Sequence, residues 1–132
     1  MRVFADTSFY IALLSASDRY HEAALRWASA YEGIILTTEY VLIEVANYYC
    51  SRNRRDAFWT LWVSLRMDSE SLVISSSPDL FANGVSLYRQ RSDKDWSLTD
   101  CISFVVMKQY ELADALTCDH HFEQAGFKVL LS

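Results

Sequence analysis

Short runs of β-branched, aromatic and aliphatic residues alternate along the chain with longer segments of helical periodicity. Segments whose apolar residues recur three and four positions apart are typical of helices, and short apolar runs bounded by polar residues are typical of strands. The runs predict strands at residues 2–6, 33–37, 71–75, 114–118 and 128–131. The segments between them predict helices at residues 7–15, 21–31, 39–51, 56–67, 78–91, 98–111 and 120–126. Strands that alternate with helices favour a three-layer α/β/α architecture with a central parallel sheet of about five strands.

The length of 132 residues predicts a single domain over residues 1–132. With 52% hydrophobic residues the chain can bury a full core, and its three glycines and one proline favour regular elements joined by short loops. The longest apolar run, residues 9–14, is too short to span a bilayer, so we expect no membrane association. Cys50, Cys101 and Cys118 lack paired spacing, which indicates free thiols and a cytoplasmic location. A formal net charge of −5 argues against broad binding to nucleic-acid duplexes, but it allows a local site that uses a metal.

The start of the predicted helix 98–111 carries an acid in a position that has two interpretations. Ser97-Leu98-Thr99-Asp100 is close to the capping-box pattern, with Ser97 as N-cap and Asp100 at the third helical position. A carboxylate in a first turn also gains about 0.3–1 kcal/mol from the helix dipole. The alternative is that Asp100 is placed there for chemistry.

Three further acids are predicted to reach the same end of the sheet as Asp100. Asp6 ends the first strand and Asp119 follows the fourth, and ligands of parallel sheets bind beyond these carboxyl ends. Helix 98–111 runs toward the start of the fourth strand, so its first turn lies at the strand-end rim. Glu44 lies in the first two turns of the helix after the second strand. The topology therefore allows four carboxylates to converge on one pocket.

Each acid also has a purely structural interpretation. Asp6 and Asp119 can cap the helices that follow them. Glu44 is harder to explain in this way, because its neighbours one turn away are apolar or uncharged and include no Lys or Arg. A carboxylate on a partly buried face needs a partner.

A cluster of carboxylates requires protons or a cation. At an effective dielectric constant near 20, two carboxylates about 4 Å apart repel by roughly 4 kcal/mol. Oxygen ligands suit Mg²⁺ or Mn²⁺, whereas zinc prefers Cys and His. Such ions lower the pKa of bound water and polarise phosphoryl oxygens, which is the chemistry of phosphodiester hydrolysis. The hydroxyls of Ser8 and Ser103 are candidates to orient the carboxylates, since Ser103 lies three residues after Asp100 on one helix face.

Four segments, FADTSF, EYVLIEVANYY, SLTDCISF and LTCDHHFEQAGF, together resemble the PIN-domain ribonucleases, and most of all the VapC-type toxins of toxin–antitoxin pairs. The resemblance implies an acidic tetrad of Asp6, Glu44, Asp100 and Asp119, with Asp6 and Asp100 as the most direct metal ligands. Asp93 and Asp95 are rivals for the third acid, and Asp95 is also a candidate accessory ligand.

The same resemblance implies a PIN-like fold and an activity. The expected activity is Mg²⁺- or Mn²⁺-dependent endonucleolytic cleavage of RNA that leaves a 5′-phosphate and a 3′-hydroxyl. It also implies a cognate antitoxin as partner, and a homodimer.

Two other functions remain open. In a non-catalytic α/β binding module, the acids would only cap helices or bind a basic partner. In a phosphatase or dehalogenase-like hydrolase, Asp6 would be the nucleophile, but Ser8 stands where a second Asp is expected and no downstream Lys is evident.

Basic and aromatic residues outside the acids add weaker hypotheses. The corner at residues 52–55, with Arg89, Arg91 and Lys94, can steer RNA phosphates or can be solvated surface. Trp59 and Trp62 form a candidate apolar face for an antitoxin or a second subunit. His120 and His121 adjoin Asp119, but no second Cys/His pair supports a zinc site.

Overall fold

A five-stranded, fully parallel sheet forms the centre of the protein in the computed structural model, which describes residues 1–132. The strand order is β3-β2-β1-β4-β5. The strands are β1 Arg2–Ala5, β2 Ile34–Thr38, β3 Ser71–Ile74, β4 Asp114–Leu116 and β5 Lys128–Val129. The predicted parallel α/β sheet is therefore confirmed.

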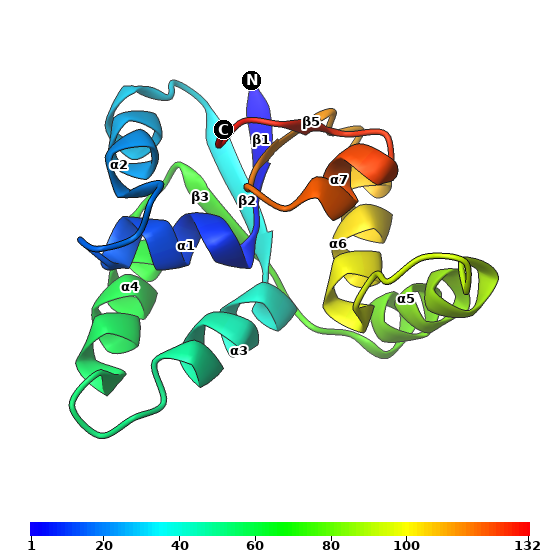
Figure 1. Cartoon of the computed structure of the whole chain (residues 1–132), viewed down its shortest axis with the longest axis horizontal. Coiled ribbons are helices and arrows are strands. Elements are labelled where there is room, and N and C mark those ends of the chain that lie inside the picture. The colour runs from blue at the N-terminus through cyan, green and yellow to red at the C-terminus, as the bar shows by residue number, and fades with distance from the viewer.

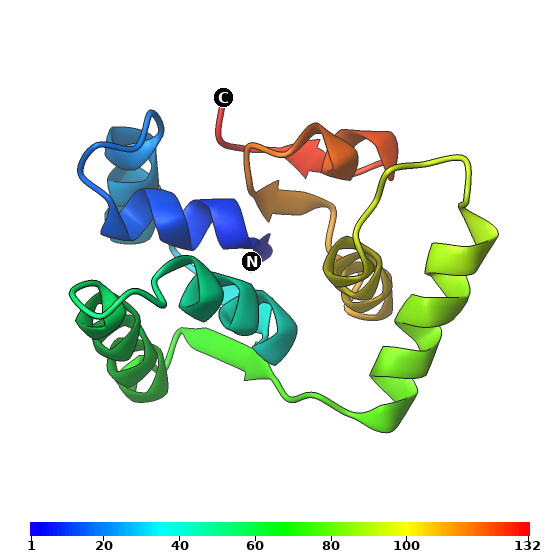
Figure 2. The same ribbon diagram turned by 60° about the horizontal axis from the view of Figure 1, so that its bottom comes forward.

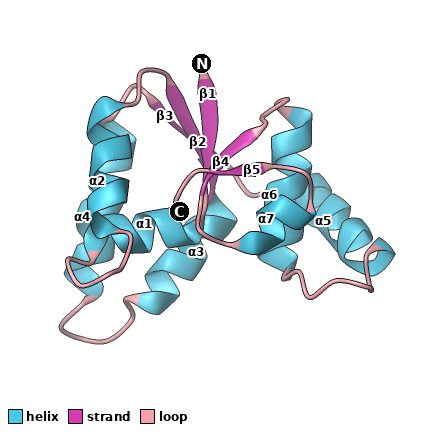
Figure 3. Cartoon of the chain, turned by 45° about the horizontal axis from the view of Figure 1, so that its top comes forward, coloured by secondary structure: helices cyan, strands magenta, loops and turns pink.

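Seven helices cover the two sides of this sheet (Figure 1). They are α1 Thr7–Leu14, α2 His21–Ala30, α3 Glu39–Tyr48, α4 Arg55–Met67, α5 Pro78–Gln90, α6 Leu98–Gln109 and α7 His120–Gln124. Helices α1 to α4 lie on one side and α5 to α7 on the other, and Figures 2 and 3 show the same separation from other directions. This arrangement is the predicted three-layer architecture. None of the helices is both long enough and apolar enough to cross a membrane.

The core lies between the sheet and its helices. Phe4 and Leu36 are fully buried on neighbouring strands, where they pair in register. Phe104 of α6 packs edge-to-face against Phe122 of α7, with ring centroids 4.9 Å apart. Apolar contacts of this kind fix where α6 and α7 sit on the sheet, and thereby where their first turns lie.

Several helices and strands begin or end a few residues away from the predicted positions. Strand β2 begins at Ile34 rather than at Gly33, because the Gly33 φ of +145° lies outside the range of strands. A Cβ at this position would lie 2.4 Å from the Met1 carbonyl oxygen, so the position requires glycine. Helix α3 ends at Tyr48 rather than at residue 51, and the Arg55 guanidinium donates to the Cys50 carbonyl just beyond it. Strand β4 ends at Leu116 rather than at residue 118.

The strand order reverses at β1, which pairs with β2 on one side and β4 on the other. Chains that leave the carboxyl ends of β1 and β4 turn toward opposite sides of the sheet, which opens a crevice between them. Residue 6 and residues 117–119 lie directly beyond these two strand ends. The fold therefore places the candidate acids at the sheet's ligand-binding edge.

Candidate active site

A pocket of about 350 Å³ lies beyond the carboxyl ends of β1 and β4, and all four predicted acids line it. Its ten lining residues include no Lys or Arg. They are Asp6, Thr7, Ser8, Ile11, Glu44, Asp95, Ser97, Asp100, Asp119 and His121. Five of these side chains are carboxylic acids, so the pocket has a strong demand for positive charge or protons.

Asp6 is the most deeply placed of these acids, with 4% of its surface exposed. The pKa of Asp6 is raised from 3.8 to about 7, chiefly by burial and to a lesser extent by the nearby charges of Asp100 and Glu44. The Thr7 backbone N–H and the Thr117 hydroxyl act in the opposite direction. Thr117 Oγ1 donates to Asp6 Oδ2 at 3.0 Å. Asp6 stands at the N-cap of α1, but its side chain accepts no capping hydrogen bond.

Asp100 is fixed by the capping box that the sequence predicts. The Ser97 hydroxyl accepts from the Asp100 backbone N–H at 3.0 Å, and Asp100 Oδ2 accepts from the Ser97 N–H at 3.2 Å. Only 8% of Asp100 is exposed. Burial and then the charge of Asp119 raise the pKa of Asp100, while the Ser97 N–H and His121 lower it. The carboxylate therefore both starts α6 and faces the pocket.

Glu44 reaches the pocket from α3, and its partner is a hydroxyl rather than a cation. Thr7 Oγ1 donates to Glu44 Oε1 at 2.5 Å, which joins the first turn of α1 to α3. Glu44 is half-buried. Thr38 caps α3 by accepting from the Val41 N–H at 3.1 Å, so the helix start is fixed at the same strand end. The cap fixes where α3 begins, and thereby the position of Glu44 within the first two turns of this helix.

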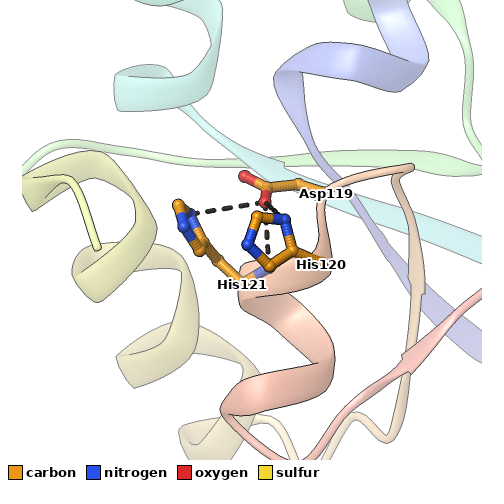
Figure 4. Close-up of side chains that lie close together, drawn as sticks. All are labelled: Asp119, His120 and His121. Carbon is orange, nitrogen blue, oxygen red and sulfur yellow. Dashed lines mark hydrogen bonds and ion pairs between the residues drawn. The ribbon is translucent and has the colours of Figure 1, made fainter. Parts of the chain in front are cut away.

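Asp119 caps α7, as its structural interpretation predicts, and lines the pocket at the same time. Its Oδ1 accepts from the His121 backbone N–H at 2.9 Å. Figure 4 shows the rings of His120 and His121 beside the Asp119 carboxylate. His121 Nδ1 lies 3.3 Å from Asp119 Oδ1 and 3.3 Å from Asp100 Oδ2, so this imidazole joins two acids of the pocket.

The hydroxyls of Ser8 and Thr117 form a hydrogen-bonded chain that ends at the Asp6 carboxylate. Ser8 Oγ lies 3.0 Å from Thr117 Oγ1, and Thr117 contacts both Asp6 and the Asp119 N–H, the latter at 3.0 Å. Ser8 therefore reaches Asp6 through Thr117. Ser103 differs from our expectation, because its fully buried hydroxyl has no hydrogen-bonding partner and does not line the pocket. Its i+3 spacing from Asp100 did not predict this outcome, because spacing along a helix does not show which groups a buried hydroxyl meets.

Sequence reasoning missed two residues of this site. Thr117 is fully buried and contacts Asp6, Ser8 and Asp119. The sequence had predicted it only as a residue inside the strand at 114–118. His121 was considered as a zinc ligand, a role that the sequence does not support, yet it lines the pocket. The only hint in the sequence was that both lie two residues from Asp119, just past the end of a strand, which does not identify their contacts.

The donor set tests whether a hard divalent cation fits here. Carboxylates and hydroxyls line the pocket, with one imidazole and no thiol, which suits Mg²⁺ or Mn²⁺ better than a thiolate-preferring metal. The one set of three candidate ligands whose atoms all lie within 4.8 Å is Asp119, His120 and His121. His120 is exposed and does not line the pocket, so that set does not form an enclosed site. Buried acids with raised pKa values fit a group that supplies positive charge.

Comparisons with known proteins agree with this fold and pocket. A family model described as the PIN domain matches residues 3–128. The 23S rRNA-specific endonuclease VapC20 of Mycobacterium tuberculosis is 30% identical over 129 residues, which cover 95% of each chain. The crystal structure of M. tuberculosis VapC20, described as a Sarcin-Ricin loop cleaving toxin, has a TM-score of 0.85 at 26% identity over 95% of each chain. The structure of VapBC2 from Rickettsia felis bound to a promoter DNA fragment shares the fold, with a TM-score of 0.68 at 14% identity over 98% of this chain and 96% of that one.

A parallel α/β sheet with a carboxylate-lined pocket at its switch point is the architecture of a PIN-like domain. The chain belongs to the PIN-domain family, and a VapC-type endonuclease is among its relatives. The resemblance seen in the sequence is therefore confirmed. Nucleases of this family generally depend on divalent metal ions.

Proposed function

We propose that this chain is an endoribonuclease that uses Mg²⁺ or Mn²⁺ held by Asp6, Glu44, Asp100 and Asp119. The observation that carries the proposal is the pocket itself, which gathers these four acids and Asp95 without any Lys or Arg. Carboxylates at such a density are stable only with protons or a cation. A non-catalytic module would have no need to bury two of them, as this chain buries Asp6 and Asp100.

In the proposed reaction, some residues hold the ion and others orient the carboxylates that hold it. When bound, a divalent ion lowers the pKa of a bound water and polarises a phosphoryl oxygen. Asp6 and Asp100, the two buried acids, are the most direct ligands in this proposal. Thr7 holds the Glu44 carboxylate, and Thr117 holds that of Asp6. These hydroxyls fix the orientation of the ligands before an ion arrives.

The substrate that we propose is RNA, with cleavage that leaves a 5′-phosphate and a 3′-hydroxyl. The relative that is 30% identical over 95% of this chain is named a 23S rRNA-specific endonuclease, which supports RNA as the substrate class. An aspartate-nucleophile hydrolase is less well supported. A nucleophilic carboxylate must be ionised, whereas the pKa of Asp6 is raised to about 7. Ser8 also occupies the position where a second Asp would act as acid.

We also propose a cognate antitoxin as partner and a homodimer as the assembly. One structurally similar chain comes from a toxin–antitoxin complex of Klebsiella pneumoniae. A groove of about 470 Å³ between α3 and α4 is suited to an apolar segment of the antitoxin. Trp59, which is 62% exposed, and Trp62 line this groove. Large exposed aromatic residues of this kind commonly mark protein interfaces.

The test is cleavage of labelled RNA by the purified chain with Mn²⁺ or Mg²⁺. Wild type should cut, and Asp6→Asn and Asp100→Asn should each lose cutting by at least about 100-fold, because each removes one charge from the ion's ligands. Asp79→Asn, an exposed acid in the first turn of α5, is the matched control and should cut like wild type. Equal cutting by all four proteins would reveal a contaminant and refute the proposal.

Calorimetry and expression give independent readings. Mn²⁺ titrated into the wild type should bind, and Asp6→Asn should bind it at least about 10-fold more weakly. Expression of the wild type should arrest growth, and co-expression of the neighbouring open reading frame should relieve the arrest. Relief that persists fully in Trp59→Ser would argue against the α3–α4 groove as the antitoxin's site.

A further inference from the structure

A second pocket, of about 490 Å³, lies next to the acidic one, and Asp95 lines both. Its other lining residues are Tyr88, Arg89, Ser92, Lys94 and Trp96. They come from the end of α5 and from the segment that leads to α6. Its size is within the range of small-ligand pockets, which span about 300–1,000 Å³.

The two neighbouring pockets have opposite electrostatic character. The acidic pocket has no Lys or Arg, and the whole chain carries a formal charge of −5. A polyanion that approaches such a surface is repelled unless cations close to the site hold it. Arg89 and Lys94 are the cations that line the adjoining pocket.

Neither of these two cations is neutralised within the protein. Arg89 and Lys94 form no ion pair with a carboxylate, whereas the neighbouring Arg91 is engaged by Asp93 in a bidentate pair at 3.0 and 3.1 Å. The Arg91 guanidinium also stacks 4.9 Å from the centroid of the Trp96 ring. Arg91 therefore has a structural role, and Arg89 and Lys94 are left to bind a ligand.

The floor of the second pocket is rigid and is tied to the acidic pocket. Trp96 is 6% exposed, its indole N–H donates to Gln124 at 3.0 Å, and its ring packs against Phe104 at 4.9 Å. The next residue, Ser97, is the N-cap whose capping box fixes Asp100. One ordered segment thus sets both the pocket floor and an acidic side chain of the active site.

We infer that this second pocket is an RNA-binding subsite, in which Arg89 and Lys94 contact backbone phosphates next to the scissile bond and Tyr88 stacks on a base. Tyr88 is 54% exposed, so its ring is available for stacking, which suits a nucleobase of any sequence. The inference rests on the proposed nuclease function and identifies the residues that position its substrate.

The basic corner at residues 52–55 does not offer an equivalent surface. Arg54 stacks over the rings of Tyr48 and Tyr49 at 4.9 and 4.7 Å, and none of the four residues lines the acidic pocket. Figure 1 places the connection between α3 and α4 at the far end of α3 from the sheet. The exposed Arg52 is therefore a matched control, a cation of the same type at a distance from the site.

The experiment measures binding separately from cleavage. Anisotropy of a labelled single-stranded RNA of about 20 nucleotides is followed in EDTA with the full chain and with Arg89→Ala, Lys94→Ala, Tyr88→Ala and Arg52→Ala. At about 100 mM salt, we expect each cation variant to raise Kd about 3- to 10-fold. Each should also make the negative slope of log affinity against log salt shallower by about 0.7. Tyr88→Ala should raise Kd by about 5- to 100-fold.

Cleavage in Mn²⁺ provides the second reading. The three pocket variants should raise KM with kcat within about two-fold of wild type, because they position substrate and do not hold the ion. Melting temperatures should remain unchanged, since the altered side chains are exposed or half-buried and form no core.

The possible failures are distinct. If the wild type cleaves RNA and the pocket variants bind it no more weakly than Arg52→Ala, the subsite is wrong while the nuclease assignment stands. If the wild type neither binds nor cleaves RNA, the proposed function itself fails.

Discussion

Replacing Asp6 by Asn should make the metal-free protein more stable at high pH, although most buried substitutions destabilise. Asp6 is 4% exposed, and its pKa in the folded protein is about 7, raised by burial and by the neighbouring acids. In the unfolded chain the group has an ordinary pKa of about 3.9. The folded state therefore holds a proton over a pH range in which the unfolded state has released it.

The sign and size of the expected stability difference between Asp6→Asn and wild type follow from proton linkage. A folded-state pKa above the unfolded value gives stability that is complete below about pH 4 and is lost as the pH rises through about 7. A difference of about three pKa units, at 1.36 kcal/mol each, corresponds to roughly 4 kcal/mol lost by pH 8. Asn has the same shape, carries no charge and can still accept the Thr117 hydrogen bond. The variant avoids most of this loss.

Thermal melting in EDTA at pH 5 and pH 8 is the assay. With an unfolding entropy of about 2.1 cal/mol/K per residue, a gain of about 2–4 kcal/mol raises the melting temperature of Asp6→Asn over wild type by roughly 7–14 °C at pH 8. The difference should shrink by more than half at pH 5. Asp79→Asn, at an exposed position, should show no such gain.

Adding Mn²⁺ should reverse the order at pH 8, because the ion stabilises only a chain that binds it. An Asp6→Asn variant that melts at or below the wild-type temperature in EDTA at pH 8 would show that the Asp6 carboxylate is not held at an energetic cost. The same temperature difference at pH 5 and pH 8 would refute the proton-linkage reasoning.

Three further substitutions test the surroundings of the site. Gly33→Ala should destabilise by about 1–3 kcal/mol in urea unfolding, because the φ of +145° and the Met1 carbonyl both exclude a Cβ; a loss below about 0.5 kcal/mol would contradict this. Ser97→Ala should cost about 1 kcal/mol through the lost cap and should also weaken Mn²⁺ binding, since the Asp100 backbone N–H loses its acceptor and the first turn that carries this carboxylate is held less firmly; unchanged calorimetry would separate the cap from the site. Thr117→Val keeps the side-chain shape but leaves Asp6 and the Asp119 N–H without their partner, so we expect about 1–3 kcal/mol of lost stability and a cleavage rate at least 10-fold lower; wild-type rates would remove Thr117 from the site.

Much of this protein could be predicted from local sequence patterns. The alternation of apolar runs and helical segments predicted every strand and helix, because side-chain periodicity directly reflects strand and helix geometry. The Ser97–Asp100 capping box was predicted because its partners are three residues apart. The convergence of Asp6, Glu44, Asp100 and Asp119 on one pocket was predicted from topology, since carboxyl ends of parallel strands share one edge.

Other features depend on contacts between distant parts of the chain. Thr117 joins Asp6 across 111 positions, and His121 meets Asp100 across 21, so no local pattern indicated either contact. Ser103 lies on the expected helix, but packing rather than spacing decides which groups its hydroxyl meets. The pKa of Asp6 likewise arises from burial, which exists only after the sheet and helices enclose the side chain. The sequence by itself determined which elements form and which acids reach the edge of the sheet, whereas tertiary packing decided their partners, their burial and their charge.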